Sequence, residues 1–425
     1  GAVRLDSGRP KATTGRFDIV SSDPLATLAI TSEGDTLFSS DTLTLPASLA
    51  NDVTAQQQWL LEQLPDANEE SELPFLGGLM GYWSYDLGRD LADIASQHPA
   101  ATHLPSLRVG LFDWCITLDH VNEQAWFVGS PARREQVMAW LAAPDAPVAP
   151  FKLTRRFSPE LSQAAYTERF DAVQRYIRAG DCYQINLAQR FSARYEGDEW
   201  QAYLQLREAT PTPFSGFMAW GDHAVLSLSP ERFIQSRDGL VETRPIKGTR
   251  PRGKTPEEDR VLAEDLLKST KDRAENVMIV DLLRNDLGRV CVPGSIRVPQ
   301  LCQLESYPNV HHLVSVVQGR LAPQHSPLSL LTAAFPGGSI TGAPKIRAMQ
   351  IIDELEPCQR SVYCGSLGYI DVRGSMDTSI AIRTMVADRG DLHVWGGGGL
   401  VADSQAGEEY TETLDKIRHL ISALE

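Results

Sequence analysis

SPERFIQSRDGLVETRPIKGTRPRG, residues 229–253, is the stretch that decides how this chain folds and where its chemistry lies. Two strand-like segments flank Asp238 and Gly239, a pair that favours the positive φ angles of a tight hairpin turn. The stretch therefore predicts two antiparallel strands whose return brings Glu231 and Lys247 near each other. A carboxyl group and an amine would then share one site.

Lys247 is useful as a nucleophile only when its amine is neutral. At a reference pKa of about 10.4, deprotonating a lysine at pH 7 costs roughly 4 to 5 kcal/mol. Burial or neighbouring cations must offset that cost, and Arg244, Arg250 and Arg252 are close enough in sequence to lower the pKa of the lysine. A basic loop in water explains the same residues more simply, and spacing alone favours that interpretation.

The composition is that of a globular protein that binds neither nucleic acid nor a membrane. With 425 residues, 42% of them hydrophobic, the chain can bury a large core in one large or two medium domains. The formal net charge of −15 argues against general binding of nucleic acid or anionic lipid. An anionic substrate must therefore meet a local cationic site or a bound metal ion.

Cysteine spacing and hydropathy predict a cytoplasmic protein. The six cysteines contain no CxxC pair, which argues against a zinc site or a disulfide framework. Neither a signal peptide nor an apolar run of about 18 residues is present. The sequence does not begin with Met, and the true N-terminus is left open.

Residues 1–150 predict an α+β region. Short apolar strand-like runs accompany one helix near residues 51–64. The glycine-rich segment 77–82 predicts close packing of strands, because its spacing matches no nucleotide-binding loop. An Ala/Pro-rich stretch at 142–150 predicts a linker, so we expect a second region over residues 151–425.

The second region begins with a helix and a long strand. Ser162 is a suitable N-cap and Gly180 a suitable stop for that helix. The strand over residues 182–195 places Gln184 on a polar face that is suited to lining a site. Farther on, residues 271–286 predict a helix that is apolar on so many sides that it should be buried.

Two glycine-rich segments later in the chain offer backbone N–H groups. PGGSITGAPK, residues 336–345, resembles a phosphate-binding loop, but no Ser or Thr follows Lys345, so we do not expect ATP binding. Its free N–H groups suit a carboxylate equally well. The four glycines at 396–399 indicate either close approach of a ligand or tight strand packing.

An acidic stripe lies on the last predicted helix, residues 407–424. Glu409, Glu412 and Lys416 share one face at i, i+3 and i+7, for which a solvated surface is the usual explanation. Mg²⁺ prefers carboxylate oxygens. Glu275, which on its own is explained as a carboxylate near a helix N-terminus, would complete a magnesium site only if the two helices converge.

Several stretches together resemble one known family, the chorismate-utilising enzymes. The matching segments are GDCYQINLAQRF (180–191), SPERF (229–233), RPIKGTRPRG (244–253), KDRAENVMIVDLLRNDLGRV (271–290), HHLVS (311–315), PGGSITGAPK (336–345), MDTSIAIRT (376–384) and GGGGLVADS (396–404). They cover essentially residues 160–425, and RFDIV with GGLMGYWSYDLGR extends the resemblance towards the N-terminus. It implies an α/β fold of the α+β type, with two face-to-face, mainly antiparallel sheets, helices outside and Mg²⁺-dependent chemistry in a cleft.

Two positions distinguish branches of this family. Isochorismate and salicylate synthases carry a lysine base where this chain has Gln184, and anthranilate synthases carry alanine where it has Lys247. The PIKGT and PGGSITGAPK forms resemble the branch that converts chorismate and ammonia to 4-amino-4-deoxychorismate in the 4-aminobenzoate/folate pathway. An anthranilate synthase and a non-catalytic regulatory member of the family are the alternatives.

The resemblance also implies roles for individual residues. Lys247 would attack C2 of chorismate to give a covalent adduct, Glu231 would act as the acid, and His312 would orient or polarise that region. Mg²⁺ would be held by Glu275, Glu409 and Glu412. The substrate-binding residues would be Gln184, Thr249, Thr341, Tyr363, Arg383, Gly397, Gly399 and Lys416.

Ammonia must reach the site from a partner. We find no glutaminase segment, so the resemblance implies a separate glutamine amidotransferase subunit. Some relatives hold tryptophan in a pocket formed partly by the N-terminal region and a segment aligned with residues 210–218. The sequence TPTPFSGFM differs there from the NPSPYMF of feedback-inhibited anthranilate synthases, so we do not expect inhibition, while an amino-acid pocket involving residues 1–150 is left open.

Overall fold

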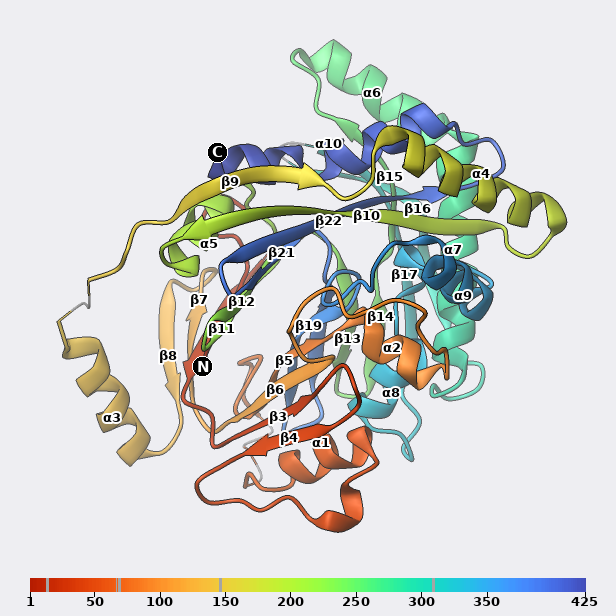
Figure 1. Cartoon of the computed structure of the whole chain (residues 1–425). Helices are drawn as coiled ribbons and strands as arrows, with labels where there is room; N and C mark the ends of the chain where they lie inside the picture. Colours follow the sequence, from red (N-terminus) through yellow and green to blue (C-terminus); the bar gives the residue numbers. More distant parts are fainter. Residues whose placement is uncertain (13–14, 66, 68–69, 145–146, 308–309) are drawn as a thin grey trace.

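Two large antiparallel sheets form the framework of the chain (Figure 1). The computed structural model describes residues 1–425 apart from 13–14, 66, 68–69, 145–146 and 308–309. Within the described residues each sheet has 11 strands. The predicted fold, with two mainly antiparallel sheets and helices outside, is confirmed.

The first sheet combines strands from the beginning and the end of the chain. Its spatial order is β18 (Gly342–Ala343), β10 (Gln184–Glu196), β22 (Asp391–Leu400), β21 (Thr384–Asp388), β12 (His223–Ser229), β11 (Phe214–Trp220), β1 (Ala2–Asp6), β2 (Phe17–Ser22), β7 (Cys115–Asp119) and β8 (Gln124–Val128), and β9 (Lys152–Pro159) pairs with β10.

The second sheet has the same mixed origin. Its order is β15 (Ile246–Pro251), β17 (Val310–Arg320), β14 (Leu240–Thr243), β13 (Arg232–Arg237), β20 (Met376–Ile380), β19 (Ser366–Asp371), β5 (Gly78–Trp83), β6 (Leu107–Phe112), β3 (Ala26–Ile30) and β4 (Thr36–Ser39), and β16 (Arg297–Ser306) pairs with β17. Each sheet therefore contains strands from before residue 150 in the sequence and strands from after it. The boundary near residue 150 stays a prediction, and residues 145–146 of the expected linker lie outside the described residues.

Helices cover the outer faces of the sheets (Figure 1). They are α1 (Val53–Leu61), α2 (Tyr85–Leu91), α3 (Pro131–Ala142), α4 (Gln163–Ala179), α5 (Glu199–Ala209), α6 (Pro256–Lys268), α7 (Thr270–Gly288), α8 (Pro327–Ala334), α9 (Lys345–Leu355) and α10 (Ala406–Leu424), with short 3₁₀ turns η1 (Ala47–Leu49) and η2 (Gly338–Ile340). None of the helices formed by the described residues is long and apolar enough to cross a membrane.

Two apolar clusters hold these layers together. The larger includes Leu187 of the first sheet and Leu367 of the second, so the two sheets pack on each other. The smaller cluster joins Leu226 of the first sheet to Leu206 of α5 and Leu420 of α10. At roughly 25 cal/mol per Å² of buried apolar surface, these contacts provide the main stabilisation of the fold.

The hairpin expected around Asp238 and Gly239 is confirmed. Arg237 pairs with Leu240 at the end of β13 and β14, and the two turn residues have φ values of 52° and 73°, as a two-residue hairpin turn requires. The chain then passes β17 and returns beside it as β15, which carries Lys247. This return brings the lysine back towards Glu231.

The N-cap and stop residues predicted the bounds of α4 correctly. The prediction that the helix over residues 271–286 is buried is wrong. Ser162 caps α4, and Gly180 ends it with φ 84°. On α7, Ile279 and Leu283 are buried, but Val277 is 46% exposed. The helix therefore lies on the surface with one face on β17, because its apolar residues exceed what that face can bury.

Candidate active site

A cavity of about 570 Å³ brings together most of the residues expected from the sequence. Strand β15 supplies Lys247 to its wall, and α7 and α10 supply carboxylates. The predicted site residues on the wall are Glu231, Lys247, Thr249, Glu275, His312, Tyr363, Arg383, Gly397, Gly399, Glu409, Glu412 and Lys416. They come from eight separate segments of the chain, so the fold assembles the site.

Lys247 lies in a setting that favours its neutral amine. Loss of solvent lowers the pKa of the lysine, and the charge of Lys416 lowers it further, although Glu275 opposes both effects. The Nζ donates a hydrogen bond to the carbonyl oxygen of Ser339 at 3.2 Å, a contact that a neutral amine can also make. The interpretation of this segment as a basic loop in water is therefore wrong.

The three arginines near Lys247 do not perform the role considered for them. Arg244 pairs with Glu305, Arg252 with Asp259, and Arg250 with two aspartates. Their charges are neutralised by acids outside the cavity wall or at its edge. Burial and Lys416 take their place as the causes of the lowered pKa of Lys247.

Glu231 is suited to donating a proton near neutral pH. Glu231 is only 6% exposed, and burial raises the pKa of its carboxyl group to about 7. The positive charge of Lys247 and hydrogen bonds from the Ser339 side chain and the Ile246 backbone oppose this rise. An acid whose pKa lies near the working pH is well matched to general acid catalysis.

His312 stays neutral at working pH. Burial lowers the pKa of its imidazole to about 4, and the nearby charge of Arg383 acts in the same direction. The Nδ1 lies 2.9 Å from the hydroxyl oxygen of Thr249, which fixes the ring. A neutral ring held in this way can polarise a substrate hydroxyl group without adding charge to the site.

Arg383 is prepared to receive an anion. Its side chain makes neither a hydrogen bond nor an ion pair with any described residue, and its φ of 50° is strained for a residue with a side chain. Tyr363 lies in the same wall, stacked on Trp395 with the ring planes 7° apart. A half-buried guanidinium without a partner favours a counter-charge, and a substrate carboxylate supplies one.

The carboxylates on α10 fit a hard divalent ion. The Oε2 atom of Glu409 is buried without a hydrogen-bond partner among the described residues. A Cβ at Gly398 would lie 3.0 Å from that atom and 3.1 Å from Oε1 of Glu412, so both carboxylates border one small space beside the glycine strand. Lys416 pairs with Glu412 at 2.6 Å and donates to the Gly397 carbonyl oxygen at 2.8 Å.

Glu275 faces the same cavity from α7, and its position is compatible with a bound metal ion. Among the described residues, no three His, Cys, Asp or Glu side chains are grouped so that they could hold a metal ion, so Glu275, Glu409 and Glu412 do not form a complete ligand set by themselves. Mg²⁺ commonly takes only one or two carboxylates and keeps positions for water or substrate oxygens. Two converging carboxylates and an orphaned oxygen therefore fit this ion.

Two of the expected substrate-binding residues lie behind the cavity wall. The amide oxygen and nitrogen of Gln184 are buried without partners among the described residues, and a Cβ at Gly399 would lie 2.8 Å from its Nε2. The Thr341 hydroxyl donates to the Gly337 carbonyl oxygen at 3.0 Å. Ser339 of the same loop lines the cavity instead.

Sequence reasoning missed several wall residues. Ser339 was overlooked although it lies in the quoted glycine-rich loop, since the turn of η2 decides which hydroxyl group faces the cavity. Lys271 and Asp272 also line it, and their position in the first turn of the helix that bears Glu275 was the available signal.

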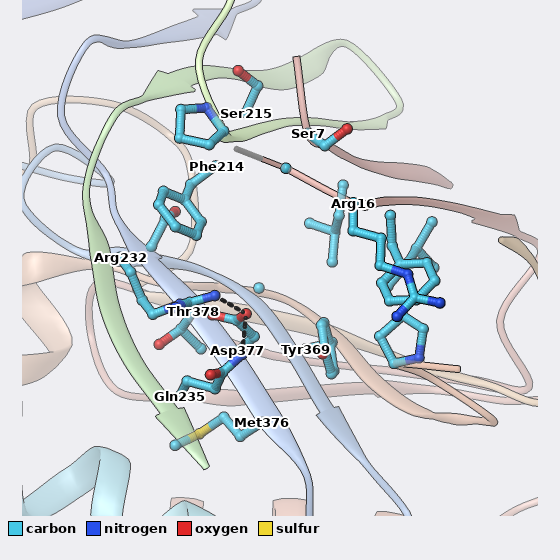
Figure 2. A pocket seen from close by; sticks show the side chains of 18 of the residues that line it. Ser7, Arg16, Phe214, Ser215, Arg232, Gln235, Tyr369, Met376, Asp377 and Thr378 are labelled. Carbon is cyan, nitrogen blue, oxygen red and sulfur yellow. Dashed lines mark hydrogen bonds and ion pairs between the residues drawn. The ribbon is translucent and has the colours of Figure 1, made fainter. Parts of the chain in front are cut away.

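A second cavity, of about 530 Å³, lies on the other side of the SPERF segment. Figure 2 shows Ser7 near Ser215 and Phe214, and Arg16 across the cavity from Arg232. Residues before 150 and the segment 210–218 thus border one space. The amino-acid pocket considered for this region stays a prediction.

Comparison with known proteins agrees with this geometry. The profile of the chorismate binding enzyme family matches residues 7–422. The chain belongs to this family. As a chorismate-binding enzyme it is 48% identical over 427 residues to aminodeoxychorismate synthase component 1 of Klebsiella aerogenes, an alignment that covers 100% of this chain and 94% of the relative.

More distant members share the architecture. Anthranilate synthase component 1 of Thermus thermophilus is 40% identical over 374 residues, which cover 86% of this chain and 80% of the relative. The crystal structure of anthranilate synthase component I from Streptococcus pneumoniae superimposes with a TM-score of 0.83 at 31% identity, covering 96% of this chain and 93% of that one.

Proposed function

We propose that this chorismate-binding enzyme converts chorismate and ammonia to 4-amino-4-deoxychorismate. The observation that carries the proposal is the amine of Lys247, which lies desolvated in the same cavity as the carboxyl group of Glu231. The whole-length similarity to aminodeoxychorismate synthase component 1 supports the same choice. An anthranilate synthase would need no nucleophile at this position.

In the first step the neutral Nζ of Lys247 attacks C2 of chorismate. The C2–N bond forms, the two conjugated ring double bonds each shift by one position, and the C4–O bond breaks as Glu231 gives its proton to the departing hydroxyl group. Water leaves, and a covalent adduct with Lys247 remains. His312, held by Thr249, polarises the same region.

In the second step ammonia adds to C4 and the lysine departs from C2. Glu231, now ionised, takes a proton from the incoming ammonia, which restores the acid for the next cycle. The enolpyruvyl group is untouched in both steps. The product is 4-amino-4-deoxychorismate, from which a separate lyase would release 4-aminobenzoate.

The two carboxylates of chorismate need separate cationic positions. Arg383 and Tyr363 would bind the enolpyruvyl carboxylate, and Lys416 with the Gly397 and Gly399 backbone would bind the ring carboxylate. Glu275, Glu409 and Glu412 would hold Mg²⁺, which when bound would supply positive charge for the ring carboxylate. Gln184 and Thr341 would support these contacts from behind the wall.

The proposal includes a partner and a place of action. Ammonia would come from a separate glutamine amidotransferase subunit, in keeping with the name component 1 that the similar proteins bear. The reaction would take place in the cytoplasm. The six cysteines are free, as is usual for proteins of a reducing compartment.

Product identity tests the proposal directly. The chain is given chorismate, Mg²⁺ and a high concentration of ammonium salt, with and without an added lyase that forms 4-aminobenzoate, and the products are separated by chromatography. We expect 4-amino-4-deoxychorismate, and 4-aminobenzoate when the lyase is present. Anthranilate as the product, or no turnover even with an amidotransferase partner, would reject the proposal.

Removal of one carboxylate is expected to weaken Mg²⁺ binding. Glu409→Gln replaces the orphaned oxygen with an uncharged amide, and we expect a loss of affinity of about tenfold or more, since each carboxylate supplies much of the charge that holds the ion. Isothermal titration with MgCl₂ in the absence of substrate measures it. Glu408→Gln, an exposed neighbour on the same helix, is the control, and equal affinities for both variants would place the ion elsewhere.

A further inference from the structure

One thin wall separates the two cavities. Pro230 and Ile246 line both of them, whereas Glu231 and Lys247 line only the first and Arg232 lines only the second. Successive side chains of an extended segment point to opposite sides. The catalytic acid and Arg232 are therefore adjacent in sequence and face opposite cavities.

Arg232 is fixed in the second cavity by several contacts. Its Nε and Nη2 atoms donate to the two carboxylate oxygens of Asp377, each at 3.0 Å, and Gln235 donates to the same carboxylate at 3.0 Å. The guanidinium carbon lies 5.0 Å from the centre of the Phe214 ring. Figure 2 shows this arrangement below Phe214. A bidentate pair of this kind fixes orientation as well as charge.

The pair spans an irregularity in the second sheet. Arg232 pairs with Ser379 and Ile234 pairs with Thr378, so Phe233 is an extra residue on β13. Such a bulge interrupts the ladder and re-aims nearby side chains. The direction of Glu231, which comes directly before the bulge, therefore depends on whatever keeps the bulge in one geometry.

Two hydrogen bonds hold the backbone of Glu231, in addition to those that the Ser339 side chain and the Ile246 N–H make to its carboxyl group. Its carbonyl oxygen accepts from the Ile380 N–H at 3.0 Å, and its N–H donates to the Ser229 hydroxyl oxygen at 3.2 Å. These bonds lie on the N-terminal side of the bulge. The Thr243 hydroxyl donates to the carbonyl oxygen of Phe233 in the bulge at 2.6 Å, and the ion pair between Arg232 and Asp377 joins two side chains across it.

We propose that Arg232, held by Asp377 across the β-bulge, is a positioning residue that aims the Glu231 carboxyl group into the active site. The inference rests on the proposed function, because it concerns the proton that Glu231 delivers. Loss of the pair would let the bulge relax and the carboxyl group drift towards solvent. A displacement of about 1 Å can reduce a rate about a hundredfold.

The charges that face Glu231 come from other elements and are untouched by this pair. They are Lys247 on β15 and Lys416 on α10, with the Ser339 hydroxyl and the Ile246 N–H as hydrogen-bond donors. The rest of the cavity wall carries Arg250, Lys271, Asp272, Glu275, His312, Arg383, Glu409 and Glu412. A change in the titration of Glu231 on altering Arg232 or Asp377 would thus report a change in its position.

Two variants that each remove one charge of the pair test the inference. Arg232→Gln and Asp377→Asn each break the ion pair, and we expect each to lower kcat with chorismate and ammonium about 10- to 100-fold with little change in KM. The double variant should lose no more than either single one, since both remove the same connection. Arg133→Gln is the matched control, because Arg133 of α3 also donates through Nε and Nη2 to one carboxylate, that of Asp113, away from both cavities.

The pH profile separates positioning from a simple charge effect. Loss of positioning lets water reach Glu231, so its pKa falls and the alkaline limb of kcat moves to lower pH in both variants. A pure charge effect would move the limb upward when the positive charge is removed and downward when the negative charge is removed. Limbs that move in opposite directions would overturn the inference.

Unchanged kcat in both single variants, or a loss equal to that of Arg133→Gln, would also overturn it. If Arg232→Gln fails to fold, Arg232→Lys keeps a charge and one hydrogen bond, and an intermediate kcat is expected from partial rescue. The wild-type chain is assayed alongside. Absence of 4-amino-4-deoxychorismate from the wild type would reject the proposed function, whereas an active wild type with unaffected variants would reject only the role of Arg232.

Discussion

Replacing Lys247 with alanine is expected to abolish the covalent adduct and to lower chorismate turnover by about a thousandfold or more. The variant keeps the acid and the carboxylate-binding groups but loses the atom that forms the bond to C2, and direct attack by ammonia would have to replace two easier steps by one harder step. Removal of a nucleophile that acts together with an acid usually has effects of at least this size.

Intact-protein mass spectrometry measures the adduct after acid quench of the enzyme with chorismate, and peptide mapping locates it. Lys254→Ala is the control, because Lys254 lies in the same basic segment and is exposed. It should keep both adduct and turnover. An adduct mapped to another residue in the wild type would contradict the nucleophilic role of Lys247.

Glu231→Gln is expected to lower kcat about 10²- to 10⁴-fold, the usual contribution of general acid catalysis. The amide is similar in size to the carboxyl group but has no proton acidic enough to give to the departing hydroxyl group. The variant should bind chorismate with nearly unchanged affinity, because Arg383 and Lys416 are intact.

The sign of the pH dependence follows from the pKa of Glu231, raised by burial to about 7. Below this pH the group is protonated and able to act as the acid, and above it the proton is lost, so wild-type turnover should fall as pH rises through about 7. Glu231→Gln should lack this limb, while Glu196→Gln, an exposed acid on β10, should keep it. A limb that persists in Glu231→Gln would assign the titration to another group.

Signals confined to a few neighbouring residues were enough for several elements of the fold. The Asp238-Gly239 pair predicted its hairpin because positive φ angles are a property of the residues themselves. Ser162 and Gly180 bounded α4 for a similar local reason. The burial of α7 was misjudged, since exposure depends on which neighbours the helix finds and not on its own apolar count.

The site needed information that local patterns do not contain. Glu409, Glu412 and Lys416 form the same stripe on a solvated helix and on one that packs beside a glycine strand, and Lys247 has the same neighbours in sequence in either case. Only the family resemblance predicted from the sequence that these residues share one site. It could not separate Ser339 from Thr341, because one turn of η2 determines which hydroxyl group lines the cavity.

The four consecutive glycines of β22, residues 396–399, also limit which substitutions could change the substrate preference of this enzyme. A side chain at Gly396 would collide with the backbone of α10 at Thr413, and one at Gly398 would crowd the two glutamates. New substrate preferences therefore cannot readily arise by mutation of this strand. Variation must fall on other strands, such as β10, which carries Gln184, and β15, which carries Lys247.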